Sequence, residues 1–199
     1  MHISEGILSG SVLVTCWAGT IIGTAYGLKH TDTDKTVRTA LISSAFFLAS
    51  LVNVRIGPSS THLSLLAPMG IILGNSVFPA VLVALMLQAL LFHFGGLLVL
   101  GANTFVMGGA ALLTHIIFGK AIREGKGRAH VRVMSFIAGV FAVMAGASLA
   151  GAFLGMTDRN FIGAVKILLI AHVPLALVEG AVTMFLVMWL KRAAPEFLS

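Results

Sequence analysis

The sequence predicts an all-α integral membrane protein, folded as a single bundle of about seven transmembrane helices. The 199-residue chain is 58% hydrophobic, and its mean hydropathy is +1.02. Only 10% of the residues are charged, whereas soluble domains carry about 25%. A chain inside a membrane must satisfy its own main-chain groups, so it forms helices or a closed barrel. Barrel strands alternate apolar and polar residues, and the long unalternating apolar runs here favour helices.

At about 20 residues per span, the length allows six or seven spans in one domain, residues 1–199. The predicted spans are residues 7–28, 39–54, 63–73, 80–94, 104–119, 133–155 and 161–190. The last exceeds a straight span and contains Pro174, so we expect it to tilt or kink. Gly19, Gly23 and Gly27 share one helix face, a spacing that lets a helix pack closely within the bundle or on a partner subunit.

Basic residues define the expected orientation. Residues 29–38, 120–132 and 191–192 hold ten of the thirteen Lys and Arg residues. Seven spans place all three segments on one side of the membrane, and the positive-inside rule makes that side cytoplasmic. We therefore expect the N-terminus outside and the C-terminus in the cytoplasm. The net charge of +6 then reflects topology and not nucleic-acid binding. No Lys or Arg precedes the first apolar run, so no ordinary signal peptide is expected.

The first six residues, the N-terminal segment, offer three nitrogen donors to one metal ion. These are the α-amine of Met1, the amide nitrogen of His2 and the ring of His2, which can form fused chelate rings. Planar nitrogen coordination is preferred by Ni(II) and Cu(II) and accessible to Co(II), and a metal can drive loss of the amide proton. The alternative is an ordinary disordered terminus.

The predicted topology favours the metal-binding interpretation. The same outer side carries a helix-breaking polar stretch that ends at His62, which is either the fourth nitrogen ligand or a structural histidine. It also carries the loop of residues 93–103, in which His93 is a candidate outer residue around the site. We expect residues 95–103 to form a packed or re-entrant loop.

Other ionisable residues have weaker functional signals. His30 and His130 are expected at the solvated surface, and His115 is expected to pack between helices. His172 and Glu179 share a face of the last span. They form either a proton relay or a structural polar clamp, and we favour the clamp. The sequence has no HExxH, GxSxG or Walker-type motif, so no enzymatic activity is predicted for the chain itself.

Five motifs together resemble the CbiM/NikM family, the substrate-specific membrane subunits of energy-coupling-factor transporters for cobalt and nickel. The motifs are Met1-His2-Ile3-x-Glu5-Gly6 and residues 53–62, 88–96, 100–103 and 171–180. The resemblance covers nearly the whole chain in order. One difference is Phe94, which stands directly before the Gly-Gly pair where many family members carry a polar residue.

The resemblance implies a metal site of four nitrogens: the Met1 amine, the His2 amide, the His2 ring and the His62 ring. Four further residues are expected to surround these ligands and orient them: Ser60, Thr61, His93 and Asn103. Expected partners are a transmembrane coupling subunit, two cytoplasmic ATPases and a small accessory membrane subunit. The chain itself is expected in the inner cell membrane. The sequence leaves open the choice between nickel and cobalt, the identity of the ATPases and the release mechanism.

Overall fold

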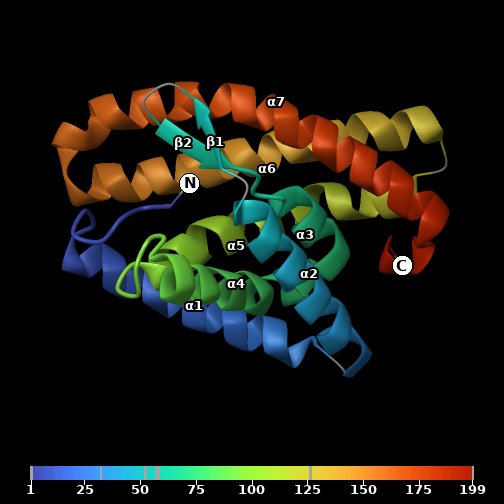
Figure 1. The fold of residues 1–199 in the computed structure, drawn as a ribbon, viewed down its shortest axis with the longest axis horizontal. Helices are drawn as coiled ribbons and strands as arrows, with labels where there is room; N and C mark the ends of the chain where they lie inside the picture. Colours follow the sequence, from blue (N-terminus) through green and yellow to red (C-terminus); the bar gives the residue numbers. More distant parts are fainter. Residues whose placement is uncertain (1, 32, 52, 57–58, 126, 199) are drawn as a thin grey trace.

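The computed structural model describes residues 2–31, 33–51, 53–56, 59–125 and 127–198, without the side chains of 33–35, 53–56 and 59–62. Seven α-helices form the bundle in this part of the chain (Figure 1): α1 Gly10–Lys29, α2 Thr33–Leu51, α3 Leu66–Leu73, α4 Val77–Phe92, α5 Leu100–Arg123, α6 Arg128–Thr157 and α7 Ile162–Ala193. Short 3-10 helices lie at Gly74–Ser76, Arg159–Phe161 and Pro195–Leu198. An antiparallel hairpin, β1 Asn53–Ile56 and β2 Ser59–His62, joins α2 to α3. Each predicted span thus overlaps one of these helices, although residues 53–54, predicted as the end of the second span, lie in β1.

Five helical segments are long and apolar enough to cross a membrane, and α2 contains a shorter apolar stretch. The predicted third and fourth spans fall in one apolar segment, residues 66–92, which bends at Gly74 (φ 55°, ψ −124°). Helix α3 has only 8 residues, too few to span a bilayer alone. The number of crossings and the orientation therefore stay predictions.

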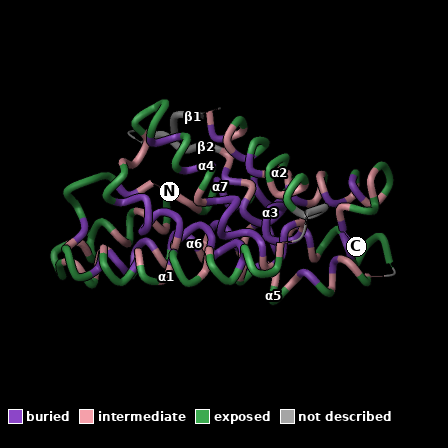
Figure 2. Tube along the Cα trace, turned by 90° about the horizontal axis from the view of Figure 1, so that it is seen from below, coloured by how far each residue is buried: buried purple, intermediate pink, exposed green. Residues whose placement is uncertain are grey.

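Helix α5 occupies the centre of the bundle and packs against α1, α3, α4 and α6. Buried residues concentrate along the middle of the molecule (Figure 2), whereas apolar side chains such as Ile21 and Ile170 are 62% and 72% exposed. Exposed side chains of this kind suit contact with lipid. The glycines of α1 face the same bundle: Gly19 lies against Phe105 and Gly23 against Phe78. This surface packs within the bundle, which is the first of the two alternatives that the spacing allowed.

The three basic segments gather at one end of the bundle. Lys191 donates from Nζ to the carbonyl oxygen of Arg123 at 3.1 Å, which joins the end of α7 to the end of α5. The guanidinium of Arg38, at the start of α2, lies 5.2 Å from the ring centroid of Phe197. We call this the basic end. The N-terminal segment contacts the opposite end of α5, at Asn103.

The predicted loop is shorter than expected. Helix α4 ends at Phe92 and α5 begins at Leu100, so the loop covers residues 93–99. Residues 100–103 form the first turn of α5 and not a loop. This turn is packed into the bundle, because the buried hydroxyl of Thr20 donates to the Gly101 carbonyl oxygen at 2.7 Å and Asn103 is buried. The non-helical stretch near His62 was predicted, but its strand pairing was not.

We predict that Gly70→Ala destabilises the bundle. A Cβ at Gly70 would overlap the main-chain carbonyl oxygen of Ala111, so α3 and α5 would have to separate. Overpacking of this kind costs about 1–3 kcal/mol. Thermal unfolding in detergent measures the effect. The matched control is Gly155→Ala, because a Cβ there meets nothing within 4 Å. Equal melting temperatures for both variants would contradict the close approach of α3 and α5.

Candidate metal centre

The N-terminal segment enters the bundle and is held there by one buried side chain. The main-chain N–H of Ile3 donates to Asn103 Oδ1 at 2.8 Å, and Asn103 Nδ2 donates back to the Ile3 carbonyl oxygen at 3.1 Å. Asn103 is 2% exposed and Ile3 is 6% exposed. The amide of Asn103 therefore pairs with the segment as a neighbouring strand would, and the described residues 2–6 do not form a disordered terminus.

The loop between α4 and α5 closes over the same segment. The Leu98 N–H donates to Glu5 Oε1 at 2.9 Å. Gly95 and Gly96 have φ values of 79° and 115°, which favour glycine. A Cβ at Gly95 would lie 2.8 Å from Asn103 Nδ2, and one at Gly96 would overlap the Glu5 side chain. The glycine pair is therefore required both for the turn and for space.

A chain of hydrogen bonds fixes the ring of His2. Ser50 donates from Oγ to the Phe47 carbonyl oxygen at 2.6 Å, so its oxygen accepts from Gln88 Nε2 at 2.7 Å. The other amide atom, Gln88 Oε1, lies 2.9 Å from His2 Nε2. Because Oε1 can only accept, His2 carries its proton on Nε2 and its lone pair on Nδ1. Nδ1 is the ring nitrogen that can close a chelate with the amide nitrogen of the same residue.

Gln88 and Ser50 are site residues that the sequence motifs do not single out. Both are fully buried. Gln88 is a polar residue within an apolar span, and such residues are functional candidates in a membrane. That signal could have identified Gln88, whereas nothing in the sequence connects Ser50 with His2.

The loop residues next to the glycine pair have distinct positions. Phe94 lies with its ring centroid 6.3 Å from that of His2. His93 is an exposed left-handed cap at the end of α4, with φ 56°. The described side chain from this loop that faces His2 is therefore that of Phe94, and the expected role of His93 stays a prediction.

Several predicted ligands and neighbours lie outside the described residues. Met1 is one of them, and the side chains of Ser60, Thr61 and His62 are also not described. The backbone of His62 lies in β2, where it pairs with Asn53. Within the described part of the chain, no three His, Cys, Asp or Glu residues gather as a metal cluster.

Glu179 anchors the chain just after His62. Its buried carboxylate accepts hydrogen bonds from the main-chain N–H groups of Ser64 and Leu65, the latter at 3.1 Å. Leu65 has a left-handed backbone, with φ 45°. Helix α7 thus fixes the direction in which the strand with His62 leaves the hairpin. Glu179 thus has a structural role, but its partners are main-chain N–H groups and the described hydrogen bonds do not include His172 in the clamp.

His172 has a different environment from that of Glu179. Its Nδ1 lies 2.8 Å from the Leu168 carbonyl oxygen and donates to it, so Nε2 carries the lone pair. Nε2 is buried and has no hydrogen-bond partner among the described residues. The described hydrogen bonds do not connect His172 with Glu179, and so they give no support to a proton relay through this pair.

Comparison with known proteins decides the family. The family model CbiM, described as a cobalt uptake substrate-specific transmembrane region, matches residues 2–197. The chain belongs to the CbiM family. This confirms the resemblance inferred from the five motifs.

Relatives of this CbiM-family chain include a Haemophilus influenzae protein whose name assigns it provisionally to metal transport. It is 33% identical over 201 residues, 100% of this chain and 97% of its own. The cobalt transport protein CbiM of Kyrpidia tusciae is 31% identical, over 100% of this chain and 86% of its own. The fused nickel transport protein NikMN of Rhodobacter capsulatus is 28% identical, over 100% of this chain and 64% of its own.

The fold is also that of a solved transporter. The crystal structure of a truncated transition metal transporter superposes with a TM-score of 0.81 at 25% identity, and the match covers 96% of this chain and 99% of that one. Together with the apolar helices, the match shows that this CbiM-family chain is a multi-pass membrane protein.

We predict that Asn103→Ala releases the N-terminal segment. The main-chain groups of Ile3 would lose both buried partners, which costs about 1–3 kcal/mol. Hydrogen exchange at the Ile3 amide should accelerate about 10–100-fold, which mass spectrometry of the N-terminal peptide measures. The control is Asn160→Ala, at the exposed turn before α7. Unchanged protection in Asn103→Ala would show that another contact holds the segment.

Proposed function

We propose that this chain is the substrate-binding subunit of an energy-coupling-factor transporter, and that it binds Ni2+ or Co2+ from the outer side of the cell membrane. The family description and the names of the relatives refer to cobalt and nickel transport. The chain is accordingly a transport protein and not an enzyme. The proposed ligands are the Met1 amine, the His2 amide, His2 Nδ1 and the His62 ring.

One observation carries the proposal: a hydrogen bond to Gln88 orients the His2 ring and fixes its tautomer. Gln88 holds Nε2–H, so Nδ1 carries the lone pair that the chelate needs. Metal-binding histidines commonly donate their other N–H to such an oxygen, which fixes the tautomer and the ring orientation. The side chain of Asn103 forms hydrogen bonds with both the N–H and the carbonyl oxygen of the next residue, Ile3. The chelating residues are thus attached to a fixed point in the bundle.

This donor set accounts for selectivity by geometry. Planar coordination by four nitrogens suits Ni(II) and Co(II) but penalises Zn(II), which prefers a tetrahedron, and Mg(II), which prefers oxygen ligands. Every ligand competes with protons, so metal affinity should fall as the pH falls.

Delivery of the ion requires other subunits. We propose that a transmembrane coupling subunit and two cytoplasmic ATPases drive uptake, with a small accessory membrane subunit. The gathering of the basic segments at one end of the bundle supports an orientation with that end in the cytoplasm. The N-terminal segment would then face the outside.

We predict that two residues added before Met1 abolish metal binding, because the extension converts the chelating amine into an amide. Equilibrium dialysis and the visible absorption of the bound Ni2+ or Co2+ measure the loss. The control is an extension of the same two residues after Ser199, which should bind one equivalent. Equal binding by both extended forms would place the site elsewhere and refute the proposed function.

We predict that Gln88→Met weakens metal binding about 10–100-fold, because the His2 ring would lose the group that fixes its tautomer. Isothermal titration with Ni2+ measures the affinity. The control is Thr20→Val, which also removes a buried hydrogen bond but lies away from His2. If the control alone lost affinity for Ni2+, or if both variants lost it equally, the weaker binding would be due to general destabilisation of the bundle.

A further inference from the structure

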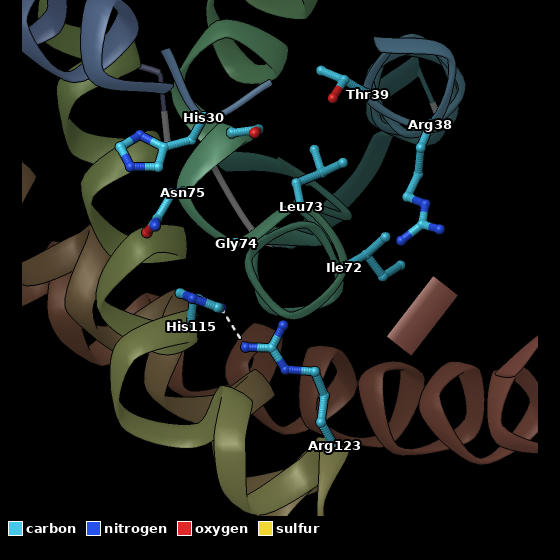
Figure 3. A pocket seen from close by; sticks show the side chains of 10 residues that line it. His30, Arg38, Thr39, Ile72, Leu73, Gly74, Asn75, His115 and Arg123 are labelled. Atoms are coloured by element: carbon cyan, nitrogen blue, oxygen red, sulfur yellow. Dashed lines mark hydrogen bonds between the residues drawn. The ribbon is translucent and has the colours of Figure 1, made fainter. Parts of the chain in front are cut away.

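A second site lies at the basic end, far along α5 from the N-terminal segment. A cavity of about 280 Å³ opens between the end of α1, the start of α2, the end of α3 and the last turns of α5. Figure 3 shows the side chains that line it. The lining residues are His30, Arg38, Thr39, Ile72, Leu73, Gly74, Asn75, Ser76, His115 and Arg123.

The cavity carries positive charge. The guanidinium groups of Arg38 and Arg123 approach the end of α3 from two sides (Figure 3), and no carboxylate belongs to the described residues that line the cavity. Neither group forms an ion pair with any residue whose side chain is described. Arg38 lies over the Phe197 ring, a contact that holds the cation without neutralising it. A site with these two charges repels metal ions and attracts anions.

The imidazole of His115 lines the same cavity. Arg123 Nη2 lies 3.5 Å from His115 Nδ1, which therefore accepts and leaves the proton on Nε2. His115 lies against Gly74 of the cavity wall, where a Cβ would lie 3.3 Å from Nε2. Sequence analysis treated His115 only as a packing residue.

The hydroxyl of Thr39 supplies an independent observation. Thr39 Oγ1 is buried and has no hydrogen-bond partner among the described residues, although it belongs to a residue that lines the cavity. Buried polar groups normally have partners, and an unpartnered one calls for a ligand or an ion. A hydroxyl can donate to an anion, as the two guanidinium groups can.

We propose that this cavity binds a phosphate group, supplied by the headgroup of an anionic phospholipid in the leaflet at the basic end. Guanidinium groups pair with phosphate through two parallel hydrogen bonds, and phosphate accepts from several donors at once. Exposed apolar side chains next to the cavity residues, Leu41 on α2 and Ile116 on α5, can contact the acyl chains. Basic pockets between helices at the cytoplasmic side are typical sites for such headgroups.

The test uses the full chain, purified in detergent and titrated with phosphatidylglycerol or phosphatidylcholine during native mass spectrometry. We expect one phosphatidylglycerol to bind about ten-fold more tightly than phosphatidylcholine, and Arg38→Gln and Arg123→Gln each to weaken its binding about ten-fold. The matched control is Arg128→Gln, since Arg128 is exposed at the same end but does not line the cavity. Thr39→Val removes one hydroxyl without changing charge and should weaken binding by a smaller factor.

A second arm titrates inorganic phosphate in lipid-depleted protein. If phosphate binds with the same dependence on Arg38 and Arg123, the phosphate site is confirmed and its ligand is soluble. Equal lipid and phosphate binding by the wild-type chain and by the Arg38, Arg123 and Thr39 variants would overturn the proposal. Ni2+ binding at the N-terminal segment should be unchanged in all of these variants, so failure of this site is distinguishable from failure of the proposed function.

Discussion

Main-chain N–H and C=O groups inside an apolar bundle must have partners, and this constraint shapes two non-helical segments, the N-terminal segment and the turn after the β-hairpin. Asn103 satisfies both main-chain groups of Ile3, so the N-terminal segment can enter the bundle. Glu179 satisfies two N–H groups after the β-hairpin, so that segment can turn back into α3. Both groups are buried side chains on long helices, which makes the two segments as fixed as the helices that hold them.

The proposed metal chemistry depends on that attachment. A flexible terminus with the same nitrogens would chelate metal but would lose conformational entropy in doing so. Here the connected hydrogen bonds from Ser50 through Gln88 to His2 set the tautomer of the His2 ring. The ring of Phe94 lies near that of His2, and the ring of Phe92 stacks on Phe94. The protein therefore supplies orientation more than additional ligands, because most of the expected donors belong to the main chain and to His2 itself.

Helix α5 connects the two ends of the molecule. Its first turn carries Asn103 at the N-terminal segment, and its last turns carry His115 and Arg123 at the basic cavity. The two proposed sites have opposite electrostatic requirements, since one would bind a cation through nitrogen donors and the other gathers guanidinium groups. Their separation along one buried helix keeps these requirements from interfering.

Hydropathy, charge placement and the chemistry of Met1 and His2 are local properties, so the sequence by itself determined the membrane class, the positions of seven helices and the candidate chelate. It placed residues 100–103 in a loop, because glycine in an apolar run does not reveal the packing that buries Gly101 and Asn103 in α5. Only the tertiary structure decided which distant groups meet. Gln88 lies 86 residues from His2 and Asn103 lies 100 residues from Ile3, and contacts over such distances arise when helices pack and leave no trace in local sequence patterns.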